Sequence, residues 1–166
     1  MRILFYTIWA ILLAILQPTL IQWIAVFGIA PNAFLVFVIL AGYLRGRTEG
    51  AVAGLVFGMV YDLLIGKLMG VNALLFMYVG FGAGILSEKF FGDSNVWMIA
   101  VTVMVAALVT GVLYWMIAGM VYGPISFYTG FVKTIIPESI YNAVICVPLF
   151  FLVRATALLV KKKTAY

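Results

Sequence analysis

Long apolar stretches separated by short polar breaks set the pattern of this sequence. A helix that crosses a bilayer needs roughly 20 predominantly apolar residues, so these stretches predict membrane-spanning helices. We expect six spans, over about residues 3–27, 31–44, 50–65, 70–86, 96–118 and 138–160. A tight turn at Gly66–Lys67 joins the third and fourth spans, and a charged loop covers residues 87–95. Residues 119–137, rich in glycine and aromatic side chains, are expected to form a partly interfacial outer segment.

The composition supports a membrane protein and narrows its chemistry. The 166 residues are 67% hydrophobic and 9% charged, whereas soluble domains carry about 25% charged residues. The chain has one cysteine and no histidine, which argues against a disulfide framework, histidine-based metal sites and histidine-dependent nucleophilic catalysis. We expect an all-α integral membrane protein, a six-helix bundle with one transmembrane domain over residues 1–166. We expect no metal, no cofactor and no enzymatic activity.

The basic residues indicate the orientation of the predicted bundle. With six spans, eight of the ten Lys and Arg residues fall on the side of the two termini: Arg2, Arg45, Arg47, Lys89, Arg154, Lys161, Lys162 and Lys163. Only Lys67 and Lys133 fall on the other side. The positive-inside rule therefore places both termini in the cytoplasm. Because these residues flank apolar runs and form no patch, we expect contacts with lipid headgroups and no nucleic-acid binding.

A row of small residues with a spacing of four runs through the third predicted span and the turn after it. Its members are Gly50, Gly54, Gly58, Asp62, Gly66 and Gly70. Small residues at this spacing allow two helix backbones to approach closely in a membrane. Gly80, Gly82 and Gly84 in the next span offer a complementary surface. We favour a helix-packing role for the row over the alternative, a substrate-lining face.

Asp62 is the unusual member of this row, since buried carboxylates in membrane spans either pair with polar groups or line an ion path. Its candidate partners are Asn72, Asn142 and Lys67. We favour a hydrogen-bonded helix clamp over ion coupling, because Glu138 is the only other carboxylate expected near a span. The Asp62→Asn substitution should then be tolerated.

Polar and aromatic residues elsewhere supply the remaining candidate sites. Asn142 is expected to hydrogen-bond across helices and Pro148 to kink the sixth span. A possible partner or ligand surface is formed by Asn32 and the outer aromatic residues Tyr122, Phe127, Tyr128 and Phe131. Aromatic side chains anchor interfaces, but they also lie at headgroup depth. Both interpretations remain open.

Several of these motifs occur together in an order that is similar to a known family. In the first half of the chain these are Ala30-Pro31-Asn32, the basic pair Arg45 and Arg47 before Glu49-Gly50, and the series Gly54, Gly58 and Asp62. They are followed by the run Gly70-Val71-Asn72-Ala73-Leu74 and by Gly80. Near the end of the chain come Pro137, Asn142-Ala143 and Pro148-Leu149. Over nearly its whole length the chain resembles the bacterial rod shape-determining protein MreD family. Asn32 stands where that family often has Asp.

The resemblance implies a function and a set of partners. It implies a non-enzymatic subunit of the cell-elongation machinery in the bacterial inner membrane, which supports rod shape and peptidoglycan synthesis. The implied partners are an MreC-type protein, a RodA-type glycosyltransferase with its class B transpeptidase, and the MreB cytoskeleton. It also implies a fold similar to the substrate-binding subunits of vitamin transporters. The alternative function is therefore a substrate-binding subunit of a small-molecule transporter, which requires an outward-facing cavity with converging polar groups. The sequence offers few such groups: Asn32, Asn72, Asp62, Tyr128 and Glu138.

Overall fold

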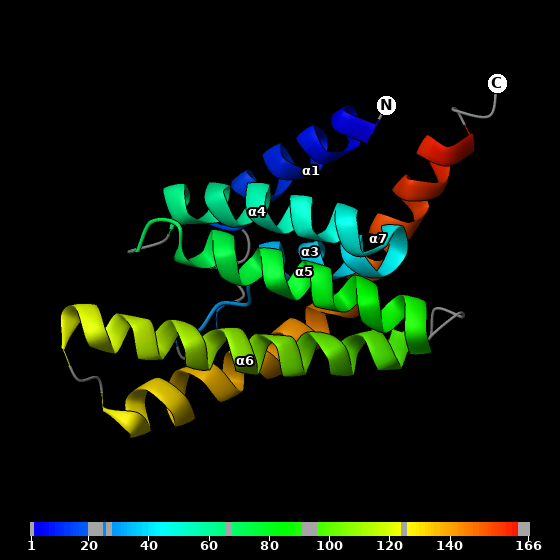
Figure 1. The fold of residues 1–166 in the computed structure, drawn as a ribbon. Helices are drawn as coiled ribbons and strands as arrows, with labels where there is room; N and C mark the ends of the chain where they lie inside the picture. The colour runs from blue at the N-terminus through cyan, green and yellow to red at the C-terminus, as the bar shows by residue number, and fades with distance from the viewer. Residues whose placement is uncertain are drawn as a thin grey trace.

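The computed structural model describes residues 2–19, 25, 28–65, 68–90, 96–123 and 126–162. The regular elements in these ranges are all helical (Figure 1): α1 (Arg2–Leu16), α3 (Ala33–Arg45), α4 (Arg47–Leu64), α5 (Val71–Phe90), α6 (Val96–Tyr122), the π-helix η1 (Tyr128–Ile135) and α7 (Ile136–Lys162). The expectation of an all-helical fold is confirmed in this part of the chain.

The first helix is shorter than the predicted span over residues 3–27. α1 ends at Leu16, where the Gln17 N–H closes the last turn on the Leu13 carbonyl at 2.9 Å. Pro18 follows, and proline cannot continue the backbone ladder because it has no N–H group. The described residues from there to Asn32 are non-helical, although they are largely apolar. Trp23 and Phe27, which belong to the predicted span, lie outside the described residues.

Helix α3 forms the centre of the bundle. Asn32 caps it by accepting a hydrogen bond from the Leu35 N–H through its side chain at 3.1 Å, as expected of a residue that favours helix N-caps. Every residue from Ala33 to Tyr43 is buried, and α3 contacts α4, α5, α6 and α7. A helix that is apolar on all sides is typical of such a fully enclosed position.

Helices α4 and α5 form an antiparallel pair beside α3 (Figure 1). Gly46, with φ of 95°, makes the sharp turn from α3 into α4, since a left-handed backbone conformation favours glycine. The predicted turn residues Gly66 and Lys67 lie outside the described part. The chain enters α5 through Gly70, and α5 continues to Phe90, beyond the predicted start of the charged loop at residue 87.

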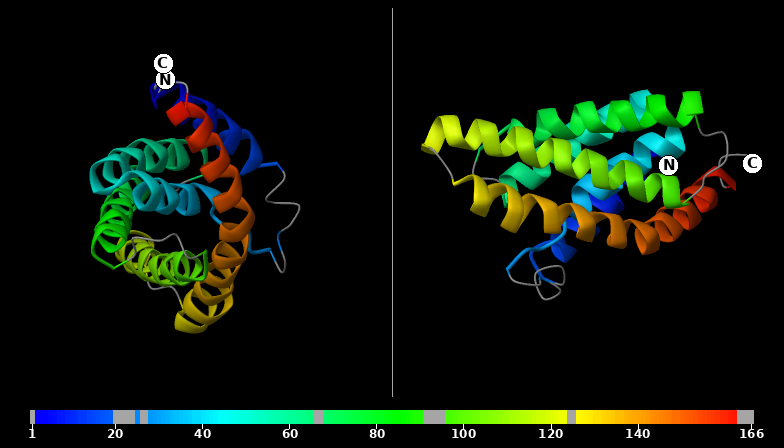
Figure 2. Two further views of the ribbon diagram at one scale, coloured as in Figure 1. Left: turned by 90° about the vertical axis from the view of Figure 1, so that its right-hand side faces the viewer. Right: turned by 90° about the horizontal axis from the view of Figure 1, so that it is seen from below.

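The outer segment over residues 119–137 is more helical than the sequence suggested. α6 extends to Tyr122, and the π-helix η1 leads directly into α7. The pattern of apolar runs predicts a boundary near residue 138, yet no irregular segment separates η1 from α7. α7 contains Pro148 and is bent along its length (Figures 1 and 2), in agreement with the expected effect of an internal proline.

Three helical segments of the described chain are long and apolar enough to cross a membrane: Val71–Lys89, Val96–Tyr122 and Tyr128–Thr156. Ile3–Leu16 and Ala33–Arg45 are apolar but shorter. The count of six spans therefore stays a prediction. Figure 2 shows that α1 begins and α7 ends at the same end of the bundle, which we call the termini end. The α4–α5 turn and the α6–η1 connection lie at the opposite end, which we call the turn end (Figure 1).

Candidate functional site

The glycines of α4 lie directly against the backbones of α3 and α5. A side chain at Gly50 would collide with the Gly80 carbonyl of α5, and its Cβ would lie 2.6 Å from the Cα of Gly42 on α3. A side chain at Gly54 would collide with the backbone of Phe76. Small residues at such contacts allow helix backbones to approach this closely.

The same contact continues along both helices. A Cβ at Gly58 would lie 2.5 Å from the Cα of Ala73, and one at Gly84 would collide with the backbone of Arg47. Gly82 does not take part, because nothing lies within 4 Å of the position its Cβ would occupy. We call the closely packed set the glycine seam; it consists of Gly42, Gly50, Gly54, Gly58, Gly80 and Gly84.

Gly70 differs from the other members of the predicted row. It precedes α5 in a turn, has φ of 87°, and has nothing within 4 Å of the position that a Cβ would occupy. The expectation that Gly70 packs helices through its small size is therefore wrong. Its backbone conformation favours glycine, and its N–H donates to Asp62.

Asp62 holds the turn between α4 and α5 through three hydrogen bonds. Its Oδ2 accepts from the backbone N–H of Gly70 at 2.9 Å and of Ala73 at 3.1 Å, and its Oδ1 accepts from Nδ2 of Asn72 at 2.7 Å. Only 3% of Asp62 is exposed. The two backbone donors belong to the start of α5, where helix N–H groups lack intrahelical partners and favour a negative charge. The geometry is that of a side-chain cap between two helices.

Asn142 was considered as a partner of Asp62, but it pairs with Asn32 instead. Its Oδ1 accepts a hydrogen bond from the Asn32 N–H at 2.6 Å, so it joins α7 to the start of α3 and does not reach Asp62. Gln17 completes the same region: its Nε2 donates to the Pro31 carbonyl at 2.9 Å, and its Oε1 accepts from the Ala33 N–H at 3.0 Å. Three segments distant in sequence thus meet at the N-terminus of α3, and the role of Gln17 was not anticipated.

A second cluster of interacting polar side chains lies at the termini end of the bundle. Tyr6 of α1 donates to Oε2 of Glu49 at 2.8 Å, and Nη1 of Arg45 donates to the same oxygen at 3.4 Å. The Arg45 guanidinium also lies 4.1 Å from the ring centroid of Phe5, a cation–π geometry. Arg45 therefore attaches α1 to α3 and α4, in addition to any effect of its charge on orientation.

The predicted partner or ligand surface separates into two places. Asn32 is buried, whereas Tyr122, Phe127 and Tyr128 are exposed. Phe127 stacks on Phe131 with ring centroids 5.1 Å apart, and Lys133 lies 5.4 Å from the Tyr128 ring centroid. Asn32 caps a central helix, whereas Tyr122, Phe127 and Tyr128 are exposed, so the predicted residues do not form one exposed surface.

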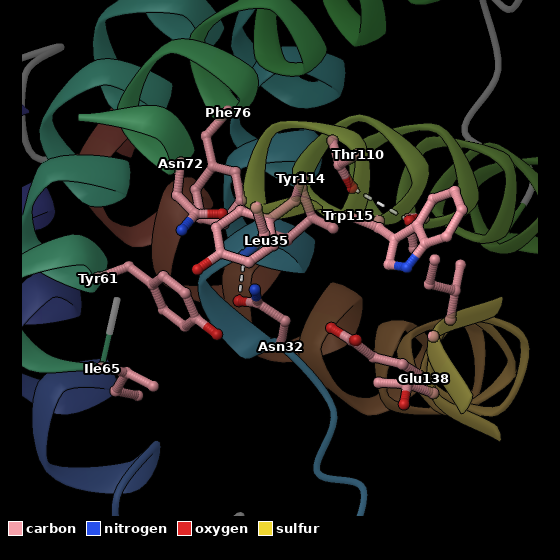
Figure 3. A pocket seen from close by; sticks show the side chains of 16 residues that line it. Asn32, Leu35, Tyr61, Ile65, Asn72, Phe76, Thr110, Tyr114, Trp115 and Glu138 are labelled. Atoms are coloured by element: carbon pink, nitrogen blue, oxygen red, sulfur yellow. Dashed lines mark hydrogen bonds between the residues drawn. The ribbon is translucent and has the colours of Figure 1, made fainter. Parts of the chain in front are cut away.

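A cavity of about 340 Å³ lies at the turn end of the bundle. Figure 3 shows its walls, which come from α3, α4, α5, α6, η1 and α7. Aromatic rings provide much of the lining: Tyr61, Phe76, Tyr114 and Trp115. Polar groups are provided by Asn32, Asn72, Thr110, Thr134 and Glu138. A mostly apolar wall with a few converging polar groups is typical of small-molecule sites.

The sequence anticipated only part of this cavity. Asn32, Asn72 and Glu138 were expected among its polar groups and do line it, but Asp62 and Tyr128 are not among the lining residues. The aromatic wall was missed. Thr110, Tyr114 and Ala118 follow one another at a spacing of four on α6, so they share one face of the helix. This polar and aromatic face within an apolar span was the available signal.

Comparison with known proteins places the chain in a family. Residues 1–161 match the family model of the rod shape-determining protein MreD. No curated protein and no solved structure matches the chain, so the fold similarity to transporter subunits stays a prediction. The match covers almost all of the 166 residues, and it agrees with the apolar helices of the described part. The chain belongs to the MreD family of rod shape-determining membrane proteins.

Proposed function

We propose that this protein is a non-enzymatic subunit of the cell-elongation machinery in the bacterial inner membrane. It docks an MreC-type protein and a RodA-type glycosyltransferase with its class B transpeptidase, and thereby connects wall synthesis to the MreB cytoskeleton. Six spans with both termini in the cytoplasm complete the proposal. The observation that carries it is the family match over residues 1–161.

The packing of the bundle supports docking through its exposed surface and not through the glycine row. Gly50, Gly54 and Gly58 are covered by the chain's own helices, and Asp62 is occupied by its own turn. In this proposal these residues, with Asn72, Asn142 and Pro148, build the fold and do not touch partners. Partner contacts then fall on the exposed apolar residues, of which the outer aromatic residues are one set.

The distribution of charge supports the proposed orientation. Arg45, Arg47 and Lys89 belong to the termini end, whereas Lys133 belongs to η1 at the turn end (Figure 1). An excess of basic residues marks the cytoplasmic side of membrane proteins. The cavity at the turn end then lies toward the outer side of the membrane.

Depletion of the protein in its own host tests the proposal. Cell width and the pattern of newly labelled wall are imaged during depletion, and a plasmid copy of the wild-type chain serves as the control. Widening or rounding with dispersed wall insertion, reversed by the plasmid copy, supports a place in the elongation machinery. Retained rod shape and normal insertion in a host with no second copy contradict it.

The cavity favours a second candidate function, a ligand-binding subunit of a small-molecule transporter. Its volume of about 340 Å³ falls within the range of roughly 300–1,000 Å³ for ligand pockets. Such a subunit should change the uptake of a solute when it is depleted and leave cell width unchanged. Uptake of labelled solutes and cell width, measured in the same depleted culture, separate the two functions.

A further inference from the structure

We propose that the cavity at the turn end binds a ligand through a protonated primary amine, with the Glu138 carboxylate as its counter-charge. The proposal concerns ligand recognition and does not depend on which partner proteins the bundle docks. It rests on the charge of the cavity, on the chemistry of its walls and on its size.

The charge of the cavity selects a cation. Among the described residues that line it, Glu138 is the only acidic one, and none is lysine or arginine. Glu138 is partly buried at the start of α7, and within the described part of the chain no ion pair joins it to a basic side chain. A carboxylate in an apolar surrounding is costly unless an opposite charge or hydrogen-bond donors accompany it. A bound ammonium group supplies both.

The walls of the cavity suit an amine in two further ways. Tyr61, Tyr114 and Trp115 present aromatic rings to it (Figure 3), and a cation near the face of such a ring is attracted to it. Asn32, Asn72 and Thr110 also line the cavity and carry side-chain oxygens. The Asn32 oxygen accepts from the Leu35 N–H and the Thr110 hydroxyl donates to Ala106, which leaves each oxygen a further lone pair. The three N–H groups of a primary ammonium need oxygen acceptors, which a quaternary ammonium does not.

An anion is the less suitable occupant, although the N-terminus of α3 borders the cavity. Helix N-termini attract anions through free backbone N–H groups. Here the N–H of Ala33 already donates to Gln17, and that of Leu35 donates to Asn32. The carboxylate of Glu138 would also repel a negative charge. The two observations together favour a cationic ligand.

The size of the cavity limits the ligand but leaves two sources for the amine. A volume of about 340 Å³ lies at the lower end of the range for ligand pockets. A small free amine and the ethanolamine headgroup of a phospholipid both present the same chemistry. Both are therefore tested, with probes that distinguish them.

The first experiment measures binding of free amines to the full chain purified in detergent. Ethanolamine and its uncharged analogue ethylene glycol are titrated separately, and binding is followed by calorimetry and by thermal unfolding. The Glu138→Gln variant removes the charge and keeps the shape. Glu88→Gln removes a carboxylate that is exposed and paired with Arg47, and serves as the matched control.

We expect ethanolamine to bind and ethylene glycol not to bind. Glu138→Gln should weaken ethanolamine binding by about tenfold or more, as expected for loss of one partner of a buried charge pair, while Glu88→Gln leaves it unchanged. Equal binding of ethanolamine and ethylene glycol would overturn the proposal. Unchanged ethanolamine affinity in Glu138→Gln would also overturn it.

The second experiment identifies a lipid source. The wild-type chain and Glu138→Gln are reconstituted into nanodiscs of phosphatidylglycerol alone or with phosphatidylethanolamine, and bound lipid is measured after extraction into detergent by native mass spectrometry. If the wild type retains phosphatidylethanolamine and Glu138→Gln does not, the amine is assigned to the lipid headgroup. Binding of free ethanolamine without lipid retention assigns it to a soluble amine. Absence of both in the folded wild type rejects the amine site.

A third variant tests the aromatic wall independently of the carboxylate. Tyr114→Phe keeps the ring and Tyr114→Leu removes it, so the difference between them isolates the contribution of the aromatic face. We expect Tyr114→Leu to bind the amine about 3- to 30-fold more weakly than Tyr114→Phe. Equal amine affinity in the two folded variants would contradict an aromatic contribution to cation binding.

Discussion

The glycine seam and the cavity are two regions of one bundle in which small residues have opposite surroundings. In the seam, the Cβ positions of Gly54 and Gly58 are occupied by the backbone of α5. Beside the cavity, Gly111 faces the side chain of Ile135, and Gly130 faces the indole of Trp115. The seam brings helices together, whereas the second pair makes room for large side chains. The spacing of glycines alone does not separate these two uses.

The two regions also differ in how their helices meet. Without a hydrophobic driving force between helices in lipid, close packing and hydrogen bonds hold a membrane bundle together. The seam provides this for α3, α4 and α5. At the turn end, side chains from α3, α4, α5, α6, η1 and α7 line the cavity, among them the aromatic rings of Tyr114 and Trp115. The seam and the cavity therefore share α3, α4 and α5.

Filling the seam should have the largest effect of any single substitution. Gly54→Leu places a side chain into the backbone of Phe76, which neither helix can avoid without separating. We expect a loss of about 3 kcal/mol or more in stability, seen as a large fall in the midpoint of thermal unfolding in detergent or as failure to accumulate in the membrane.

Gly82→Leu is the matched control for this substitution. Gly82 lies on α5 between two seam residues, yet nothing lies within 4 Å of its Cβ position. We expect its stability to stay within about 0.5 kcal/mol of the wild type, so that its unfolding midpoint changes little. Equal unfolding midpoints for Gly54→Leu and the wild type would refute the packing role of the seam.

Removing the acceptor at the edge of the seam should have the next largest effect. Asp62→Leu leaves the N–H groups of Gly70 and Ala73 and the amide of Asn72 without their acceptor. Buried donors left unpaired cost about 1–3 kcal/mol, so we expect a stability loss of about 2–3 kcal/mol in the same unfolding assay. Asp62→Asn should lose much less, because one amide oxygen can still accept both backbone bonds while Asn72 reverses its amide.

This pair of variants also distinguishes a clamp from an ion site. A clamp requires the hydrogen bonds of Asp62, whereas ion coupling requires its charge. Complementation of rod shape by Asp62→Asn in a depleted host is therefore the expected result. Loss of complementation by Asp62→Asn at a normal membrane level would favour an ion site instead.

The helix order and the seam were largely accessible from sequence, because hydropathy and the spacing of small residues are local signals. The predicted limits 31–44 and 96–118 lie close to α3 and to the greater part of α6. The contact between Asp62 and Asn72 was one of three partners considered for that carboxylate, and it is present at 2.7 Å. Local spacing restricted the choice but did not decide it.

The remaining features were not accessible because they depend on contacts between distant segments. An apolar run does not distinguish one continuous helix from a helix that ends part-way along it, so the end of α1 at Leu16 was missed. The positive φ of Gly70 depends on the turn that Asp62 caps. The cavity needs side chains from six helical elements, and no local pattern reports how these come together.

Weakening the junction at the N-terminus of α3 should have a smaller effect than Gly54→Leu or Asp62→Leu. Asn142 is fully buried and accepts from the Asn32 N–H, but its own Nδ2 has no hydrogen-bond partner. Asn142→Leu therefore loses one bond and also removes one unpaired donor. We expect a net stability loss of about 1 kcal/mol, measured by thermal unfolding. A loss as large as that of Asp62→Leu would mean that this junction contributes as much to stability as the Asp62 cap.

Truncating an outer aromatic residue should have the smallest effect on stability. It tests whether the outer aromatic residues contact partner proteins. Phe127 is 61% exposed, and Phe151, which lies on α7 outside the outer aromatic set, is 59% exposed. We expect Phe127→Ala and Phe151→Ala each to change stability by about 0.5 kcal/mol or less. If the outer aromatic residues form a partner surface, only Phe127→Ala should reduce co-purification of the MreC-type or RodA-type protein, since aromatic anchors carry much of the binding energy of an interface. Equal recovery of both partners with the two variants would instead assign Phe127 to the headgroup layer, where aromatic side chains also collect.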